Sequence, residues 1–236
     1  MEYENNREYE IAENIKKLKY EIGEAKVKAG RENDEIALVA VTKFFPAEDI
    51  YYAVKHGIEI AGENRVQELV EKQDKVFPKE WHLIGHLQKN KAKYVAGKVS
   101  LIHSADSKEL IAEIDKQAKK RGAIQNILIQ VNTSGEETKS GCAPCELSEI
   151  LSFSKDCKNV FVKGLMTIAP LYVNGVTATL HFDNTHKLYI DNKKNKYDNI
   201  SMDILSMGMS ADYKEAILSG ANMIRVGSAI FGKRNY

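Results

Sequence analysis

The chain has 236 residues, of which 43% are hydrophobic and 28% are charged. This composition is typical of a soluble globular protein, and the length suits one large domain, so we predict a single domain over residues 1–236. The 34 basic residues nearly balance the 33 acidic ones, and a net charge of +1 excludes the strong basic excess of a nucleic-acid-binding domain.

The first ten residues carry no targeting signal. They are acidic and polar, whereas a secretory or mitochondrial leader is positively charged. No apolar stretch approaches the ~18 residues that a membrane helix requires. The sequence therefore predicts a cytoplasmic protein with no membrane partner.

An amphipathic helix opens the chain. Apolar residues recur there at three- and four-residue steps, at Ile11, Ile15, Leu18, Ile22 and Ala25. Gly30 stands where such a helix would end. We predict this helix within residues 1–30, before the repeating part of the fold.

After residue 35 the sequence changes to short apolar runs that alternate with helical patterns. The first run, residues 36–41, has no polar alternation, which is typical of a parallel strand buried on both faces. Eight strands are predicted, at residues 36–41, 58–61, 81–85, 101–104, 127–131, 162–166, 204–207 and 223–226. Helices are predicted between them, including residues 176–192 and 213–218, and a short last helix begins at Ser228.

This alternation predicts the α/β class and a single (β/α)₈ TIM-type barrel over residues 36–232. The helix of residues 1–30 is an addition to that barrel. An open, doubly wound sheet is the alternative fold. It is disfavoured because no G-x-G-x-x-G motif follows the first strand.

Cys142, Cys145 and Cys157 suit a reducing compartment and do not make a disulfide framework. Cys142 and Cys145 have the CxxC spacing of some redox and zinc sites. A structural zinc site needs four ligands, however, and the sequence has no second CxxC. We therefore predict no metal site and interpret the two cysteines as a chance pair at a loop-to-helix junction.

In barrels of this type, functional residues lie at the carboxyl ends of the strands, and phosphate often binds after strands seven and eight. Ser210 follows the seventh predicted strand, and Gly227 and Ser228 follow the eighth. Backbone N–H groups at a helix start and a serine hydroxyl suit a phosphate. Glycine and serine also serve simply as turn and cap residues, but two such segments at neighbouring strand ends favour a phosphate site.

Lys43 directly follows the first apolar run. A lysine that loses water favours its neutral amine, the form that attacks an aldehyde. Lysines at strand ends more often extend to solvent, so the phosphate site at the same barrel mouth is what makes Lys43 a candidate nucleophile. From these residues alone, an aldolase-type reaction on a sugar phosphate remains an alternative.

Several longer blocks carry more specific information than any single residue. They are residues 41–43 (VTK), 62–64 (GEN), 81–91 (WHLIGHLQKNK), 139–141 (KSG), 164–168 (GLMTI), 205–210 (LSMGMS) with Asp212, and 225–232 (RVGSAIFG). In these blocks the chain resembles the pyridoxal 5′-phosphate (PLP) homeostasis protein family, from about Ala37 to Gly232. The resemblance implies a barrel of PLP fold type III, similar to the N-terminal domain of alanine racemase.

The resemblance also implies roles for particular residues. Lys43 would hold PLP as a Schiff base, and Asn64 would line the cofactor pocket. Arg225 would face the pyridine nitrogen, with Ser206 and His82 nearby. The phosphate would be held by Ser210, Gly227 and Ser228. Ser228 stands where the family often has threonine, which keeps the hydroxyl, and residues 171–199 do not match the family pattern.

The family resemblance implies a PLP carrier that stores, protects or delivers the cofactor, and not an enzyme. A PLP-dependent amino-acid racemase is the alternative. A racemase on this barrel needs a second base, which alanine racemase takes from a C-terminal β-domain, and this chain ends at Tyr236. Arg225 only donates hydrogen bonds, so beside the pyridine nitrogen it would weaken the cofactor as an electron sink. This is permissive for a racemase but unfavourable for most other PLP reactions. The expected partners are PLP and PLP-dependent apoenzymes, and the expected state is a monomer.

Overall fold

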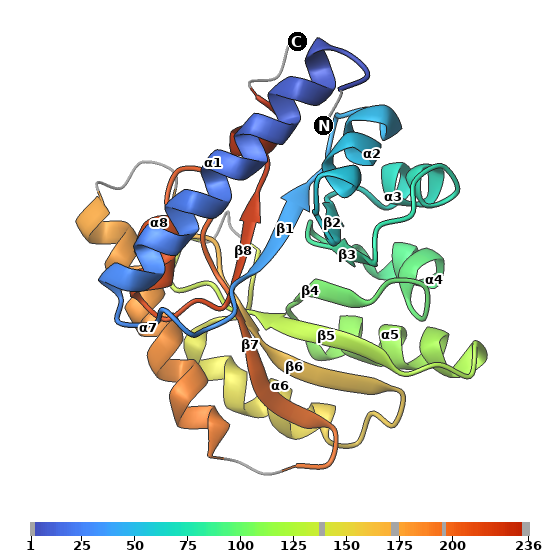
Figure 1. Ribbon diagram of the computed structural model, residues 1–236. Helices are drawn as coiled ribbons and strands as arrows, with labels where there is room; N and C mark the ends of the chain where they lie inside the picture. The colour runs from blue at the N-terminus through green and yellow to red at the C-terminus, as the bar shows by residue number, and fades with distance from the viewer. Residues whose placement is uncertain (1–2, 137–139, 171–174, 195–196, 233–236) are drawn as a thin grey trace.

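A computed structural model describes residues 3–136, 140–170, 175–194 and 197–232. Eight parallel strands close into a barrel in sequence order, and β8 is hydrogen-bonded to β1 (Figure 1). The predicted (β/α)₈ barrel is therefore confirmed, and the open doubly wound sheet is wrong. Lys139 of the 139–141 block and Tyr236 lie outside the described residues.

The strands are β1 (Ala37–Val41), β2 (Ile60–Glu63), β3 (Glu80–Leu83), β4 (Leu101–Ala105), β5 (Gln125–Gln130), β6 (Val160–Met166), β7 (Ile200–Ser206) and β8 (Met223–Val226). The helices are α1 (Asn6–Lys28), α2 (Ala47–Lys55), α3 (Val66–Gln73), α4 (Ala92–Val95), α5 (Lys108–Lys120), α6 (Leu147–Ser154), α7 (Gly175–Lys193), α8 (Tyr213–Leu218) and α9 (Ser228–Phe231). Two 3₁₀ turns, η1 (Lys89–Lys91) and η2 (Pro144–Glu146), precede α4 and α6.

Seven of the eight strands differ from their predicted bounds, and two of these differences have a clear local cause. The apolar run at residues 58–61 predicts a strand there, but Ile58 N donates to Ala53 O and completes the C-terminal turn of α2, so β2 begins at Ile60. Strand β7 begins at Ile200, four residues before the predicted start. Asp203 within it is exposed and interrupts the apolar pattern that the prediction required.

The N-terminal helix packs across the elements that follow the last two strands. Helix α1 buries Ile11, Ile15 and Leu18 and lies along α8 in Figure 1. Asn14 Nδ2 donates to Ile230 O at 3.0 Å, and Tyr213 Oη donates to Glu21 Oε2 at 2.5 Å. The added helix therefore braces α8 and α9, the helices whose first turns lie nearest the carboxyl ends of β7 and β8.

Each of the described helices is too short or too polar to cross a lipid bilayer.

Gly164 is required where β6 lies against β7. Its φ is +149°, and a Cβ at this position would overlap the carbonyl oxygen of Ile204. We expect Gly164→Ala to lower the free energy of unfolding by about 1–3 kcal/mol, because the strand backbone cannot move aside cheaply. Urea denaturation followed by circular dichroism measures this change.

Gly23→Ala is the matched control for Gly164→Ala. Gly23 lies inside α1, and a Cβ there meets no atom within 4 Å. Alanine in a helix interior should raise the free energy of unfolding by about 0.5–1 kcal/mol. Equal effects of the two substitutions would contradict the close contact between β6 and β7.

Candidate functional site

Closure of the barrel gathers the predicted site residues on four adjacent strand ends. The strands lie in the order β7, β8, β1, β2, and the register pairs Val39 with Arg225 and Val41 with Gly62. The predicted site residues follow or end these strands: Lys43 after β1, Asn64 after β2, Ser206 and Ser210 at β7, and Arg225, Gly227 and Ser228 at β8. All of them therefore share one arc of the barrel, although Arg225 and Ser206 lie inside it.

A buried ion pair fixes the backbone just before Lys43. Glu63 and Lys72 are buried, and Lys72 Nζ lies 2.6 Å from Glu63 Oε1. Lys72 Nζ also donates to Thr42 O at 2.9 Å, while Thr42 Oγ1 donates to Glu63 Oε1 at 2.8 Å. Because both charges and the hydroxyl are satisfied, the end of β1 is held rigidly below the half-buried Lys43.

The residue after Lys43 is held in an uncommon conformation. Phe44 has a φ of +68°, which costs free energy in any residue with a side chain. Phe44 N donates to Glu68 Oε2 at 3.0 Å, and the Arg65 guanidinium lies 4.8 Å from the Phe44 ring centre. Burial raises the pKa of Glu68, but hydrogen bonds from Phe44 and Lys72 outweigh it and hold this pKa below its ordinary value. Strain maintained in this way is typical of functional loops.

The loops after β7 and β8 converge on one another. Gly227 N donates to Ser210 Oγ at 3.2 Å, and Ser228 is exposed at the first turn of α9. A Cβ on Gly227 would lie 3.2 Å from Val41 Cβ, so glycine lets this loop lie close to the end of β1. Asp212 shapes the preceding loop, since its Oδ1 accepts from Met209 N at 2.6 Å.

Arg225 is a buried cation in the barrel interior. Only 3% of it is exposed, and its guanidinium donates to Ser206 Oγ at 2.6 Å and to Thr167 O at 2.8 Å. Within the described part of the chain no carboxylate forms an ion pair with it. Burial lowers the pKa of Arg225 to about 10, and the charge of Asp212 opposes that change. A buried cation without a paired anion is costly, so this position favours an anionic or electron-rich ligand.

Ser206 also connects Arg225 to two buried histidines. His103 Nδ1 lies 3.2 Å from Ser206 Oγ, and His103 Nε2 lies 3.0 Å from His82 Nδ1. His82 in turn lies 2.9 Å from Glu80 Oε2. His82 therefore reaches Ser206 only through His103, from the half of the barrel away from the mouth.

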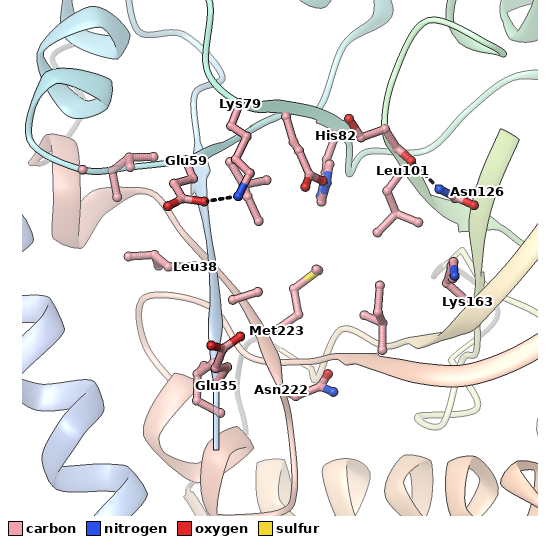
Figure 2. A pocket seen from close by; sticks show the side chains of 18 of the residues that line it. Glu35, Leu38, Glu59, Lys79, His82, Leu101, Asn126, Lys163, Asn222 and Met223 are labelled. Atoms are coloured by element: carbon pink, nitrogen blue, oxygen red, sulfur yellow. Dashed lines mark hydrogen bonds and ion pairs between the residues drawn. The ribbon is translucent and has the colours of Figure 1, made fainter. Parts of the chain in front are cut away.

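Cavities open at both ends of the barrel. At the carboxyl ends, a cavity of about 220 Å³ is lined by Asn64, Gly85, His86, Gln130 and Asn132, among others. Asn64 Oδ1 is buried beside it without a hydrogen-bond partner. A cavity of about 830 Å³ opens at the amino ends of the strands, and Figure 2 shows His82, Glu35 and Asn222 among its lining residues. Of the residues that the resemblance placed at the site, only His82 lines this larger cavity.

The residues at the carboxyl ends fit a phosphorylated aldehyde. Lys43 supplies an amine, the Ser210–Gly227 pair supplies a hydroxyl and a backbone N–H, and Arg225 supplies a buried positive charge. The unpartnered Asn64 Oδ1 accepts one further hydrogen bond. The described residues bring together no group of three His, Cys, Asp or Glu side chains that could hold a metal ion.

Comparison with known proteins identifies the family. The family described as the N-terminal domain of alanine racemase matches residues 11–235. The pyridoxal phosphate homeostasis protein of Aquifex aeolicus is 41% identical over 226 residues, which cover 95% of this chain and 98% of that protein. This chain belongs to the pyridoxal phosphate homeostasis protein family.

Solved structures agree with this membership. PipY of Synechococcus elongatus, solved with PLP bound, is 32% identical with a TM-score of 0.82, covering 94% of this chain and 100% of that one. The alanine racemase of Clostridium difficile is 16% identical with a TM-score of 0.68, covering 93% of this chain and 57% of that one. The racemase therefore shares the fold alone with the homeostasis family.

Three buried residues of this homeostasis-family chain were not anticipated from the sequence. Glu63 ends β2 and Lys72 lies in α3, and no sequence pattern indicates that the two side chains are buried as a pair. Only the fold brings them together. His103 does leave a signal, because an imidazole within the predicted buried strand of residues 101–104 must find a hydrogen-bond partner inside the barrel.

The three thiols differ in accessibility. Cys142 and Cys157 are buried, and burial raises their pKa values to about 12 and about 11, whereas Cys145 is exposed. Since the thiolate is the reactive form, we expect a thiol reagent at neutral pH to modify Cys145 alone in the native protein. Mass spectrometry after brief labelling measures this.

Denatured protein is the control for thiol labelling, and all three cysteines should react there. Rapid labelling of Cys142 in the native protein would contradict its buried position and would revive the CxxC pair as a redox candidate.

Proposed function

We propose that this chain binds PLP and acts in intracellular PLP homeostasis, by storing, protecting or delivering the cofactor. The observation that carries the proposal is the convergence of Lys43, the Ser210–Gly227 pair and the buried Arg225 on adjacent strand ends. Family membership supports it, as does PipY, a relative whose structure holds PLP. The charges and hydrogen-bonding groups of the residues present fit an anionic aldehyde.

Each residue has a role in the proposed complex. Lys43 would join the cofactor aldehyde as a Schiff base, which needs a nucleophilic amine. Ser210 Oγ, Gly227 N and Ser228 would hold the phosphate with a hydroxyl and backbone N–H groups. Arg225, oriented by Ser206, would face the pyridine nitrogen, and Asn64 would accept a hydrogen bond at the pocket wall.

Arg225 at the pyridine nitrogen would disfavour most PLP-dependent reactions other than racemisation. PLP supplies an electron sink for carbanion chemistry when its pyridine nitrogen is protonated. A guanidinium only donates hydrogen bonds, so Arg225 at this nitrogen would disfavour its protonation. The names of the curated relatives describe homeostasis and not catalysis, which agrees with this interpretation.

We further propose a single-domain monomer in the cytoplasm that hands PLP to PLP-dependent apoenzymes. Lys43 is only half-buried, its neighbour Phe44 is exposed, and so is Ser228 in the first turn of α9. An incoming amine could therefore reach the cofactor from solvent without opening the barrel.

Replacing Lys43 tests the covalent site directly. We expect Lys43→Ala to abolish the visible absorbance band that PLP gives on the wild-type protein, because the substitution removes the amine that forms the proposed Schiff base. Circular dichroism should show an unchanged fold. Borohydride reduction followed by peptide mapping should place the cofactor on Lys43 in the wild-type protein.

Lys89→Ala is the control, because Lys89 is an exposed lysine on the turn after β3. It should keep the full band. A band of equal intensity in Lys43→Ala would refute the assignment of Lys43.

The alternative function, an amino-acid racemase, requires a second base. His86 lines the cavity beside Asn64, and its Nδ1 lies 3.9 Å from Asp106 Oδ2, so this imidazole is the residue to examine. If the carrier proposal is right, incubating the PLP-loaded protein with L-alanine and other amino acids leaves their chirality and amount unchanged. Chiral chromatography measures this.

Inversion that disappears in His86→Gln would instead identify a racemase with His86 as its second base. Free PLP under the same conditions is the control for uncatalysed exchange.

A further inference from the structure

A continuous chain of hydrogen bonds crosses the barrel core from the candidate site to the opposite end. It starts at Arg225 on β8 and passes through Ser206 on β7, His103 on β4 and His82 on β3, and it ends at Glu80. The successive distances are 2.6, 3.2, 3.0 and 2.9 Å. These five residues are called the core relay below.

The two ends of the core relay lie in different environments. Ser206 and His103 are fully buried and His82 is 1% exposed, whereas the Glu80 side chain is 39% exposed. Glu80 and His82 line the cavity of about 830 Å³ at the amino ends of the strands, where Figure 2 shows His82. The relay thus connects a buried cation to a carboxylate in contact with solvent.

The hydrogen-bonding capacity of each group fixes the direction of the relay when both imidazoles are neutral. The hydrogen bond from His82 lowers the pKa of Glu80, so its carboxylate only accepts and His82 Nε2 donates. His82 Nδ1 then accepts, and His103 Nε2 must donate to it. Burial holds the pKa of His103 well below its ordinary value, which keeps that ring neutral.

The remaining partners follow from the tautomer of His103. Its Nδ1 carries no proton in this arrangement and accepts from the Ser206 hydroxyl. The lone pairs of Ser206 Oγ are then left for Arg225 Nη1, which can only donate. Every donor in the relay points away from Arg225 and toward Glu80.

We propose that His103 and His82 are positioning residues that align the core relay, so that the Glu80 carboxylate stabilises and orients the buried Arg225 guanidinium from the far end of the barrel. This inference rests on the proposed function, in which Arg225 faces the cofactor ring. Neither histidine touches the cofactor in this scheme. They act on it only through Ser206 and Arg225.

The physical reason for such a relay is the cost of burying Arg225. Hydrogen bonds that point the same way polarise one another, and the effect is larger in a medium of low dielectric constant. A chain that ends on an anion therefore presents a stronger acceptor to the guanidinium than an isolated hydroxyl does. The relay provides this acceptor while no carboxylate among the described residues forms an ion pair with Arg225.

The histidine tautomers of the wild-type protein test the alignment without PLP. Long-range proton–nitrogen NMR correlation on histidine-labelled protein at mildly alkaline pH should show His103 and His82 as Nε2–H tautomers. His103→Gln and His82→Gln assign the two sets of signals. An Nδ1–H tautomer at His103, or averaging between both tautomers, would overturn the proposal.

Glu80→Gln removes the terminal charge and keeps the size of the side chain. We expect it to weaken PLP binding about tenfold, the size of a lost hydrogen bond to a charged group, and to disturb the His103 tautomer. Glu59→Gln is the matched control, since Glu59 lines the same cavity but pairs with Lys79 outside the relay. It should leave the PLP dissociation constant and both tautomers unchanged.

Equal PLP affinity of Glu80→Gln and wild type would overturn the proposal. If Glu80→Gln does not fold, the tautomer measurement on the wild-type chain decides. If the wild-type chain keeps the predicted tautomers but does not bind PLP, the proposed function fails while the alignment of the relay stands.

Discussion

Hydrogen bonds between β1 and β8 join the first and last strands of the chain and close the barrel. The grouping of Lys43 with the residues of β7 and β8 depends on this closure. It places Lys43 beside the loop that holds Gly227, and it puts Arg225 in register with Val39 inside the barrel. An open sheet of the same strands would leave these residues on opposite edges. The carboxyl ends of four adjacent strands thus bring an amine and a hydroxyl to one arc of the barrel, with a buried cation inside it.

The barrel interior contains buried charges that need compensating partners. The chain provides these partners in two ways. Below Lys43, Glu63 and Lys72 form a direct ion pair whose remaining hydrogen bonds hold Thr42 and Phe44 in place. Arg225 has no such partner among the described residues, and its charge is met by a hydroxyl, a carbonyl oxygen and the core relay. The first arrangement makes a rigid support. The second leaves a buried cation available to a ligand, which is what a cofactor site requires.

The shared fold of this chain and alanine racemase does not settle what the chain does, because one barrel supports many chemistries. What bears on function is the set of groups at the strand ends. Under the proposed function, the guanidinium of Arg225 would face the cofactor ring. A half-buried Lys43 with an exposed neighbour suits a protein that holds PLP and releases it. His86 beside Asp106 is the feature of the mouth that a catalytic function would use.

The sequence by itself determined the elements and the general location of the site. Apolar runs such as residues 36–41 predicted buried parallel strands, the strand–helix alternation predicted the barrel, and Lys43, Ser210 and Gly227 were recognisable because strand ends are where such barrels place polar groups. Strand bounds failed where local hydrogen bonds decided them, as at Ile58. Only the tertiary structure decided which buried polar groups meet. Glu63 and Lys72, or His103 and Ser206, lie on separate elements with no pattern that pairs them, and a buried charge selects its partner by distance in the folded chain and not by spacing in the sequence.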